Sequence, residues 1–188
     1  SCGVELVLGV KVESIEAGLK VHYASVKDGA KGTAEGDVVL MAGGRAPNTR
    51  GIGLDTIGVK MDRKGFVEVD GLCRTNVPGV YAIGDCVFGK AQLAHTASAM
   101  GEVAAENIMG IPAVYDEKTN PTCVYMEPEA ASVGLTEEQC KAKGIDYKVG
   151  KFPLVANGKS LIINGGEGLV KIIADAKYEE VLGMHIIG

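Results

Sequence analysis

The hydrophobic pattern of the chain is clearest between Val80 and Gly110, where a short apolar run is followed by a longer periodic segment. Residues 80–83 are apolar and rich in β-branched side chains, which predicts a strand buried on both faces. Residues 93–109 repeat small or apolar side chains at spacings of three and four, which predicts a helix that packs close to its neighbours. The residues on this helix face are Ala94, Ala97, Ser98, Gly101, Ala104, Ala105 and Ile108.

Short apolar segments in the first 44 residues predict further strands. Residues 3–9 and 10–15 are apolar, β-branched and punctuated by turn residues, and residues 21–26 alternate in polarity. Residues 37–42 carry five consecutive apolar residues after an Asp, which predicts a central strand. Residues 27–36 hold three glycines and several charges, which predicts a turn or loop.

The pattern after the long helix predicts a region that mixes strands with one short helix. Pro112 breaks the long helix, and Thr136 and Gln139 then have the spacing of a capping box. Gly144 suits the end of a helix over 137–143. Strands are predicted over 147–152, 168–174 and 181–187, in addition to an alternating segment at 65–70 before the helix.

Composition excludes some functions and adds little to the fold. The net charge of −5 gives no support to nucleic-acid binding, and no apolar run approaches the roughly 18 residues that would span a membrane. The spacing of the five cysteines suits neither a metal site nor a disulfide framework, so we interpret them as reduced thiols of a cytoplasmic protein. They are Cys2, Cys73, Cys86, Cys123 and Cys140.

A candidate binding site lies where the predicted strand 80–83 meets the helix. Gly84 lets backbone approach a ligand closely, and Asp85 follows the strand at the position where open α/β sheets place ligand contacts. The helix N-terminus presents unpaired N–H groups and a partial positive charge. Together they can hold a polyhydroxylated, partly anionic ligand, although a buried strand, turn and helix with an Asp cap would give the same pattern.

The string AIGD followed by LAHTA resembles the second FAD-binding motif of the flavin disulfide reductases, most closely that of the dihydrolipoamide dehydrogenases. This resemblance implies that Asp85 hydrogen-bonds a ribityl hydroxyl of FAD. It also implies that the helix start lies under the flavin and stabilises negative charge at the flavin N1–C2=O edge. The residues of this helix start are Gln92, Leu93, Ala94 and His95.

Motifs on both sides extend the resemblance over the whole chain. Residues 45–49 are similar to the family's GRxPNT signature, which would make Gly44 an NAD contact, while Arg45 by itself would suit an ordinary surface ion pair. The strings GFVEVD, RTNVPGVYAIGD and PTCVYMEPEAASVGLTEEQ follow in the family's order. The resemblance implies a mixed α/β and α+β fold. Its parts are the end of a Rossmann-like NAD domain (1–46), the closing part of an FAD domain (47–118) and an α+β interface domain (119–188).

Other parts of the family pattern are missing from the sequence. It has no G-x-G-x-x-G, no C-x-x-x-x-C and no C-terminal His-Glu pair, so we assign no catalytic residue and no metal ligand and interpret the chain as an internal piece. Met100 stands where the family often has Glu, which puts the carry-over of the nicotinamide side in doubt. His185 is expected to be a packed core or interface histidine, and the segment 127–129 a solvated turn.

The resemblance implies a parent enzyme that oxidises dihydrolipoyl groups and passes electrons through a disulfide and FAD to NAD⁺. It also implies a homodimer formed through residues 119–188, and lipoyl domains of 2-oxo acid dehydrogenase or glycine cleavage complexes as partners. The isolated chain is expected to be inactive. The alternatives are a related reductase of the glutathione or mercuric type, or a non-catalytic dimerisation fragment.

Overall fold

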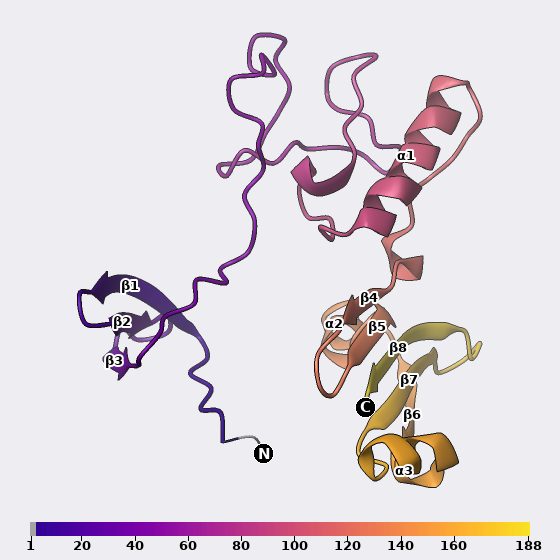
Figure 1. Cartoon of the computed structure of the whole chain (residues 1–188). Helices are drawn as coiled ribbons and strands as arrows, with labels where there is room; N and C mark the ends of the chain where they lie inside the picture. Colours follow the sequence, from indigo (N-terminus) through magenta and orange to yellow (C-terminus); the bar gives the residue numbers. More distant parts are fainter. Residues whose placement is uncertain (1–2) are drawn as a thin grey trace. The chain divides into compact units, whose positions relative to one another are not determined.

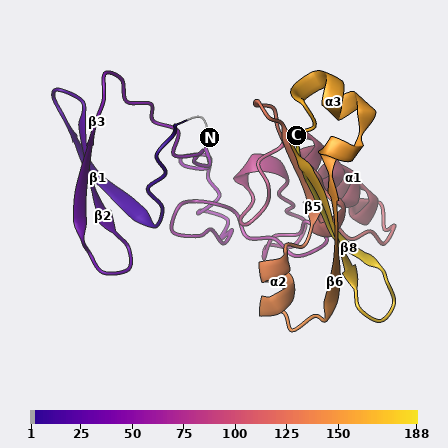
Figure 2. The ribbon, with the colours of Figure 1, turned by 90° about the horizontal axis from the view of Figure 1, so that it is seen from below.

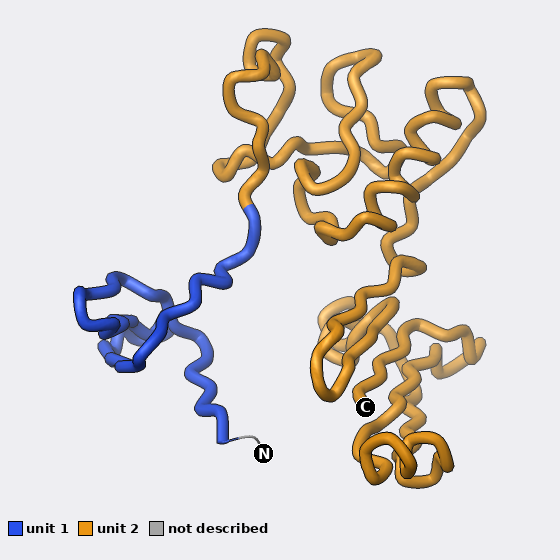
Figure 3. Tube along the Cα trace, viewed as in Figure 1, with its two compact units in different colours: residues 1–45 blue, residues 46–188 orange. Residues whose placement is uncertain are grey.

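The computed structural model describes residues 3–188, which divide into two compact units. The first unit is Ser1–Arg45 and the second is Ala46–Gly188 (Figure 3). The described secondary structure is a mixture of helices and two antiparallel sheets, in agreement with the expected mixed α/β and α+β class.

The first unit is a twisted three-stranded antiparallel sheet of order β1-β2-β3 (Figure 2). Its strands are β1 (Val10–Glu16), β2 (Lys20–Ser25) and β3 (Lys31–Glu35), so the strands predicted over 10–15 and 21–26 are confirmed. The loop predicted over 27–36 is wrong in its second half, which forms β3. The sequence of β3 has no hydrophobic alternation, and the strand depends on backbone pairing with β2, where Tyr23 lies opposite Gly32. A Cβ at Gly32 would overlap the Tyr23 ring, so a larger residue there would have to displace this ring.

Two other predicted strands of this unit are absent. Residues 3–9 and 37–42 lie outside the described strands, and Val38 and Leu40 are 84% and 85% exposed. An apolar run becomes a buried strand only when neighbouring strands pair with it and other elements cover it. None of the described strands pairs with these two segments, which explains why periodicity alone gave the wrong result.

The part of the second unit before residue 119 is built around α1 (Ala94–Ile108) (Figure 1). This helix confirms the prediction of a helix over 93–109. It is rich in alanine, which has the highest intrinsic helix propensity, and it ends before Gly110, whose φ of +79° is left-handed. The strands predicted over 80–83 and 65–70 are absent, and isolated β-bridges form in their place: Arg74 with Tyr81, and Val67 with both Met61 and Val87. The reason is that none of the described strands pairs with either segment.

The buried face of α1 differs from the expected one. Thr96 and Met100 are fully buried and Ala104 nearly so, whereas Ala94, Ser98, Ala105 and Ile108 of the expected small-residue face are exposed. Met100 and Ala104 pack with Cys73, Val87 and Tyr115 in one core cluster. Met100, the position at which the sequence departs from the pattern it resembles, is therefore a core position here.

The rest of the second unit is a five-stranded antiparallel sheet of order β4-β5-β8-β7-β6, with short helices beside it (Figure 1). The strands predicted over 147–152, 168–174 and 181–187 are confirmed, whereas β4, β5 and α3 had no counterpart in the pattern. The strands are β4 (Thr122–Val124), β5 (Ala130–Gly134), β6 (Tyr147–Pro153), β7 (Leu169–Asp175) and β8 (Val181–Ile187). The helices of this part are α2 (Glu137–Ala142) and α3 (Gly158–Asn164), with the 3₁₀ turn η3 (Leu154–Ala156). The part around α1 contains the 3₁₀ turns η1 (Gly84–Cys86) and η2 (Glu117–Thr119).

The helix α2 is fixed by its ends and by one buried residue. Its N-terminus has the predicted capping box: the Gln139 N–H donates to Thr136 Oγ1 at 3.2 Å and the Thr136 N–H to Gln139 Oε1 at 2.9 Å. Cys140 is fully buried against Leu135 and Ile173, which joins α2 to β7.

Two polar contacts complete this region. Lys171 Nζ of β7 lies 3.0 Å from Glu137 Oε1 at the start of α2, and this hydrogen bond lowers the pKa of the Glu137 carboxyl. His185 Nε2 donates to the Leu135 carbonyl at 3.0 Å, so this histidine packs within the domain, as expected. Glu127 and Glu129 are exposed at the turn between β4 and β5, which agrees with a solvated turn.

We predict that Thr136→Ala destabilises the chain by about 1 kcal/mol, because it removes the side-chain acceptor of the capping box. Urea denaturation of the purified chain measures the effect. Thr136→Ser keeps the hydroxyl and should retain nearly all of the stability. Equal losses for the two variants would contradict the capping role of the hydroxyl.

We also predict that Gly183→Ala costs about 1–3 kcal/mol or more, because the added Cβ would overlap the backbone carbonyl of Leu135. Gly150→Ala on β6 is the matched control, since a Cβ at Gly150 meets no atom within 4 Å. The measurement is the urea midpoint of both variants. A Gly183→Ala protein as stable as the control would show that the β8 backbone can move away from Leu135.

Candidate functional site

The turn that carries Asp85 lies directly against α1. Gly84 begins η1 with a left-handed φ of +75°, and a Cβ at this position would lie 3.2 Å from Ala97 Cβ. Both features favour glycine, because L side chains rarely adopt this backbone conformation and a Cβ would make a tight contact with the helix. Asp85 follows, half-buried, and the backbone on either side is held by a bond from the Val87 N–H to the Gly84 carbonyl at 3.0 Å.

Gln92 joins this turn to the start of the helix. Its Nε2 donates to the backbone carbonyl of Asp85 at 3.2 Å, and the Leu93 N–H bonds to the Ala91 carbonyl at 3.0 Å. The Gln92 side chain thus brings Asp85 next to residues 92–94, which are neighbours in the chain. These are four of the five predicted residues of the flavin motif. The sequence motif alone does not reveal that Gln92 makes this connection.

The N-terminus of α1 is suited to an anionic group. Leu93 is the N-cap residue, its backbone is extended, and its side chain makes no capping hydrogen bond. The first turn contains no acidic residue. The free N–H groups and the positive end of the helix dipole are therefore not neutralised by the helix's own side chains, which is the arrangement that binds an anionic ligand edge.

His95, the last predicted residue of the motif, is held by a segment far away in the sequence. Its ring Nε2 lies 2.6 Å from the carbonyl oxygen of Pro121. The neighbouring Thr96 is fully buried, and Asn120 Nδ2 donates to Thr96 Oγ1 at 2.6 Å. Thr96 and Asn120 were not among the residues predicted from the sequence. The spacing of Thr96, Met100 and Ala104 could have identified Thr96 as buried, but nothing in the pattern marks Asn120.

A cation lies beside the same segment. Lys90 Nζ forms an ion pair with Glu117 Oε2 at 3.2 Å and lies 5.1 Å from the centre of the Tyr115 ring. Burial raises the pKa of the Tyr115 hydroxyl, and nearby Glu117 adds to this effect. The loop before α1 and the segment 115–121 are therefore joined by charge as well as by hydrogen bonds.

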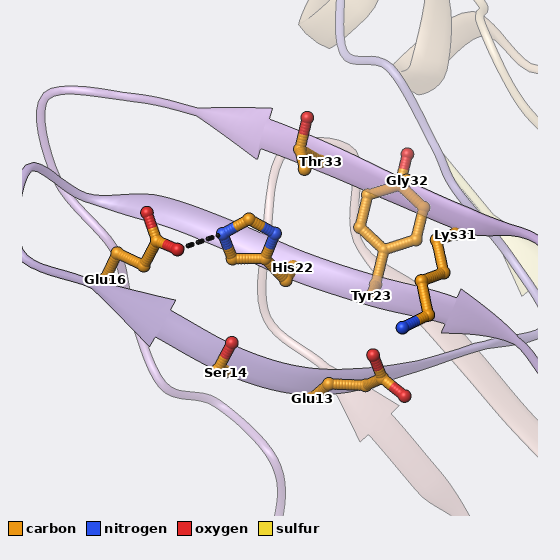
Figure 4. Close-up of a pocket in the computed structure, with 8 residues that line it drawn as sticks. All are labelled: Glu13, Ser14, Glu16, His22, Tyr23, Lys31, Gly32 and Thr33. Carbon is orange, nitrogen blue, oxygen red and sulfur yellow. Dashed lines mark ion pairs between the residues drawn. The ribbon is translucent and has the colours of Figure 1, made fainter.

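Gly44, the predicted NAD contact, belongs to the first unit. Its φ of +95° is left-handed, and a Cβ there would meet no atom within 4 Å. The same unit has an open hollow over β1, β2 and β3, in which His22 Nε2 pairs with Glu16 Oε1 at 2.9 Å (Figure 4). None of the predicted site residues lines this hollow.

The four described cysteines are free thiols, and Cys2 lies outside the described residues. Burial raises the pKa of the thiols of Cys73 and Cys86, so both favour the neutral form rather than the reactive thiolate. Among residues 3–188, no group of three or more His, Cys, Asp or Glu side chains is arranged to hold a metal ion. The described helices include none that is long and apolar enough to cross a membrane.

Comparison with known proteins gives consistent results along the chain. Residues 1–101 match the pyridine nucleotide-disulphide oxidoreductase family model, and residues 120–188 match the model of the dimerisation domain of the same family. The dihydrolipoyl dehydrogenase of Cupriavidus necator is 45% identical over 98% of this chain and 39% of its own length. The dihydrolipoyl dehydrogenase of Geobacillus stearothermophilus is 44% identical over 99% of this chain and 40% of its own length.

Solved structures give the same relationship. The crystal structure of LpdA from Mycobacterium tuberculosis superposes with a TM-score of 0.80 at 30% identity, over 99% of this chain and 40% of that protein. The flavoprotein disulfide reductase RclA from Escherichia coli gives a TM-score of 0.74 at 28% identity, over 98% of this chain and 42% of that one. The chain thus spans about two fifths of the relatives it matches, and the resemblance to flavin disulfide reductases is confirmed. By its sequence and fold, this chain belongs to the pyridine nucleotide-disulphide oxidoreductase family.

Proposed function

We propose that the protein containing this chain is a dihydrolipoyl dehydrogenase, which oxidises dihydrolipoyl groups and passes the electrons through a disulfide and FAD to NAD⁺. The observation that carries this proposal is the 45% identity to a dihydrolipoyl dehydrogenase over 98% of the chain. The uncapped helix start beside Asp85 supports it independently, because its chemistry suits a ligand with both hydroxyl groups and an anionic edge.

We assign the binding of FAD to Asp85 and to the helix start of Gln92, Leu93, Ala94 and His95. A bound flavin would supply a two-electron acceptor and donor. In this assignment the Asp85 carboxylate accepts a hydrogen bond from a ligand hydroxyl, and Gln92 holds the Asp85 turn against the helix. The first-turn N–H groups of α1 stabilise negative charge on the ligand. Gly44 is assigned to NAD, in the domain part formed by residues 1–46.

The remaining assignments concern assembly and location. Residues 47–118 are assigned to the FAD domain and residues 119–188 to a homodimer interface, which the match to a dimerisation domain supports. The proposed partners are lipoyl domains of 2-oxo acid dehydrogenase or glycine cleavage complexes, and the proposed location is the cytoplasm. The similarity to RclA favours a related disulfide reductase as the second candidate, which would act on a different substrate.

We predict that the full-length protein carries FAD and reduces NAD⁺ with dihydrolipoamide. The isolated 188-residue chain should bind no FAD and show no measurable turnover. The reason is that the chain contains no C-x-x-x-x-C disulfide and no ADP-binding G-x-G-x-x-G. NADH absorbance measures turnover, and glutathione disulfide with NADPH is the comparison substrate. A full-length protein that prefers the comparison substrate would favour the second candidate. Turnover by the isolated chain would contradict the assignment of catalysis to residues outside it.

We further predict that Asp85→Ala in the full-length protein raises the FAD dissociation constant by about tenfold or more, because a charged hydrogen-bond acceptor is lost. Flavin fluorescence during titration of the apoprotein measures the constant. Asp85→Asn keeps one acceptor oxygen and should give an intermediate value. If Asp85→Ala and the unchanged protein bind FAD equally, the assignment of Asp85 to the flavin is wrong.

A further inference from the structure

Two reciprocal side-chain contacts fasten the start of α1 to the segment that enters the five-stranded sheet. His95 reaches from the helix to the backbone of Pro121, and Asn120 reaches from the segment to the buried hydroxyl of Thr96. Both donor–acceptor distances are 2.6 Å. The two contacts join neighbouring residues of the helix, 95 and 96, to neighbouring residues of the segment, 120 and 121. They therefore resist rotation of the helix start as well as its separation from the segment.

The first contact determines which ring nitrogen of His95 donates the hydrogen bond. A backbone carbonyl oxygen can only accept a hydrogen bond, so the Nε2 atom of His95 must carry the proton. The ring is therefore held in one orientation by an acceptor that belongs to the other segment.

The second contact is buried. Thr96 is fully buried on the core face of α1, and its Oγ1 is the acceptor for the half-buried Asn120 amide. Loss of the acceptor would leave the Asn120 amide without this partner in a partly buried place, which is costly. The contact is thus a strong constraint on the residue that directly follows the proposed flavin-binding residues 92–95.

The segment that carries Asn120 and Pro121 is itself fixed at both ends. Before it, Asp116 caps η2 by accepting from the Lys118 N–H at 2.9 Å, and Glu117 pairs with Lys90. Directly after it, β4 begins at Thr122 and pairs with β5. The start of α1 is therefore tied to a segment that has hydrogen bonds, an ion pair and strand pairing of its own on either side.

We propose that His95 and Thr96 are positioning residues: through Pro121 and Asn120 they fix the helix start against the entry of the sheet, and so set how strongly the N-terminus of α1 stabilises negative charge on the flavin. This inference rests on the proposed function. It adds Thr96, Asn120 and Pro121 to the residues that govern the flavin, although none of them is assigned to touch it. Its physical basis is that the stabilisation depends on the orientation of the first-turn N–H groups.

The test uses the full-length protein with bound FAD and compares His95→Phe and Thr96→Val with the unchanged protein. His95→Phe removes the donor to Pro121, and Thr96→Val removes the acceptor for Asn120 at nearly constant volume. His95→Gln keeps an N–H donor and is the conservative rescue, while Glu106→Gln, exposed near the other end of the same helix, is the control. The readouts are the reduction midpoint potential of the bound flavin and the FAD dissociation constant.

We expect the midpoint potential to fall in His95→Phe and Thr96→Val, because the reduced, negatively charged flavin loses stabilisation. The FAD dissociation constant should rise by about fivefold to a hundredfold in these two variants. Glu106→Gln should keep the unchanged values, whereas His95→Gln, which retains an N–H donor to Pro121, should recover part of the potential and affinity lost in His95→Phe. A lower melting temperature with an unchanged potential in both test variants would mean that the contacts serve stability alone, and would overturn the proposal.

The unchanged protein separates this inference from the function on which it rests. If the unchanged full-length protein binds no flavin, the proposed function fails, and the positioning role fails with it. If it binds flavin and oxidises dihydrolipoamide while the potential is the same in all variants, only the positioning role fails. The position of the His95 proton gives a further check, since ¹⁵N NMR of the ring should show a protonated Nε2.

Discussion

The buried face of α1 is the constraint on which the candidate site depends. Met100 and Ala104 fill a core with Cys73, Val87 and Tyr115, and this packing fixes the rotation of the helix about its axis. Once the rotation is fixed, Thr96 points into the protein and Ala97 faces the turn at Gly84. The position of Asp85 relative to the helix start therefore follows from the hydrophobic packing of this core, which includes Val87 two residues further along the chain.

Strands with clear hydrophobic alternation and partners close in sequence could be predicted from the pattern, whereas β3, β4 and β5 could not, although they too pair with strands close in sequence. The strands β1 and β2 form a hairpin, β6 pairs with β7 and β7 with β8, all between neighbours in the chain, whereas β8 also pairs with the more distant β5. The runs at 37–42 and 80–83 have the composition of buried strands, yet no described strand lies beside them. Composition gives the propensity of a segment to form a strand, whereas pairing with another strand decides whether the strand forms.

The same distinction applies to the site. The capping box of α2 uses residues three apart, and the motif from Asp85 to His95 is continuous, so both can be identified by reading along the chain. The contacts of Thr96 with Asn120 and of His95 with Pro121 join residues 24 and 26 positions apart. No periodicity relates such residues, and an Asn-Pro pair by itself indicates only a turn.

These long-range contacts have an energetic consequence for ligand binding. A helix start held by Gln92 on one side and by the Asn120–Pro121 segment on the other has already lost much of its conformational freedom before a ligand arrives. Ordering a loop or side chain on binding subtracts from the affinity, so a turn that is ordered beforehand can use more of its interaction energy for the ligand. The left-handed φ at Gly84 also limits the freedom of this turn, because few other residues adopt this conformation and the backbone lies close to Ala97.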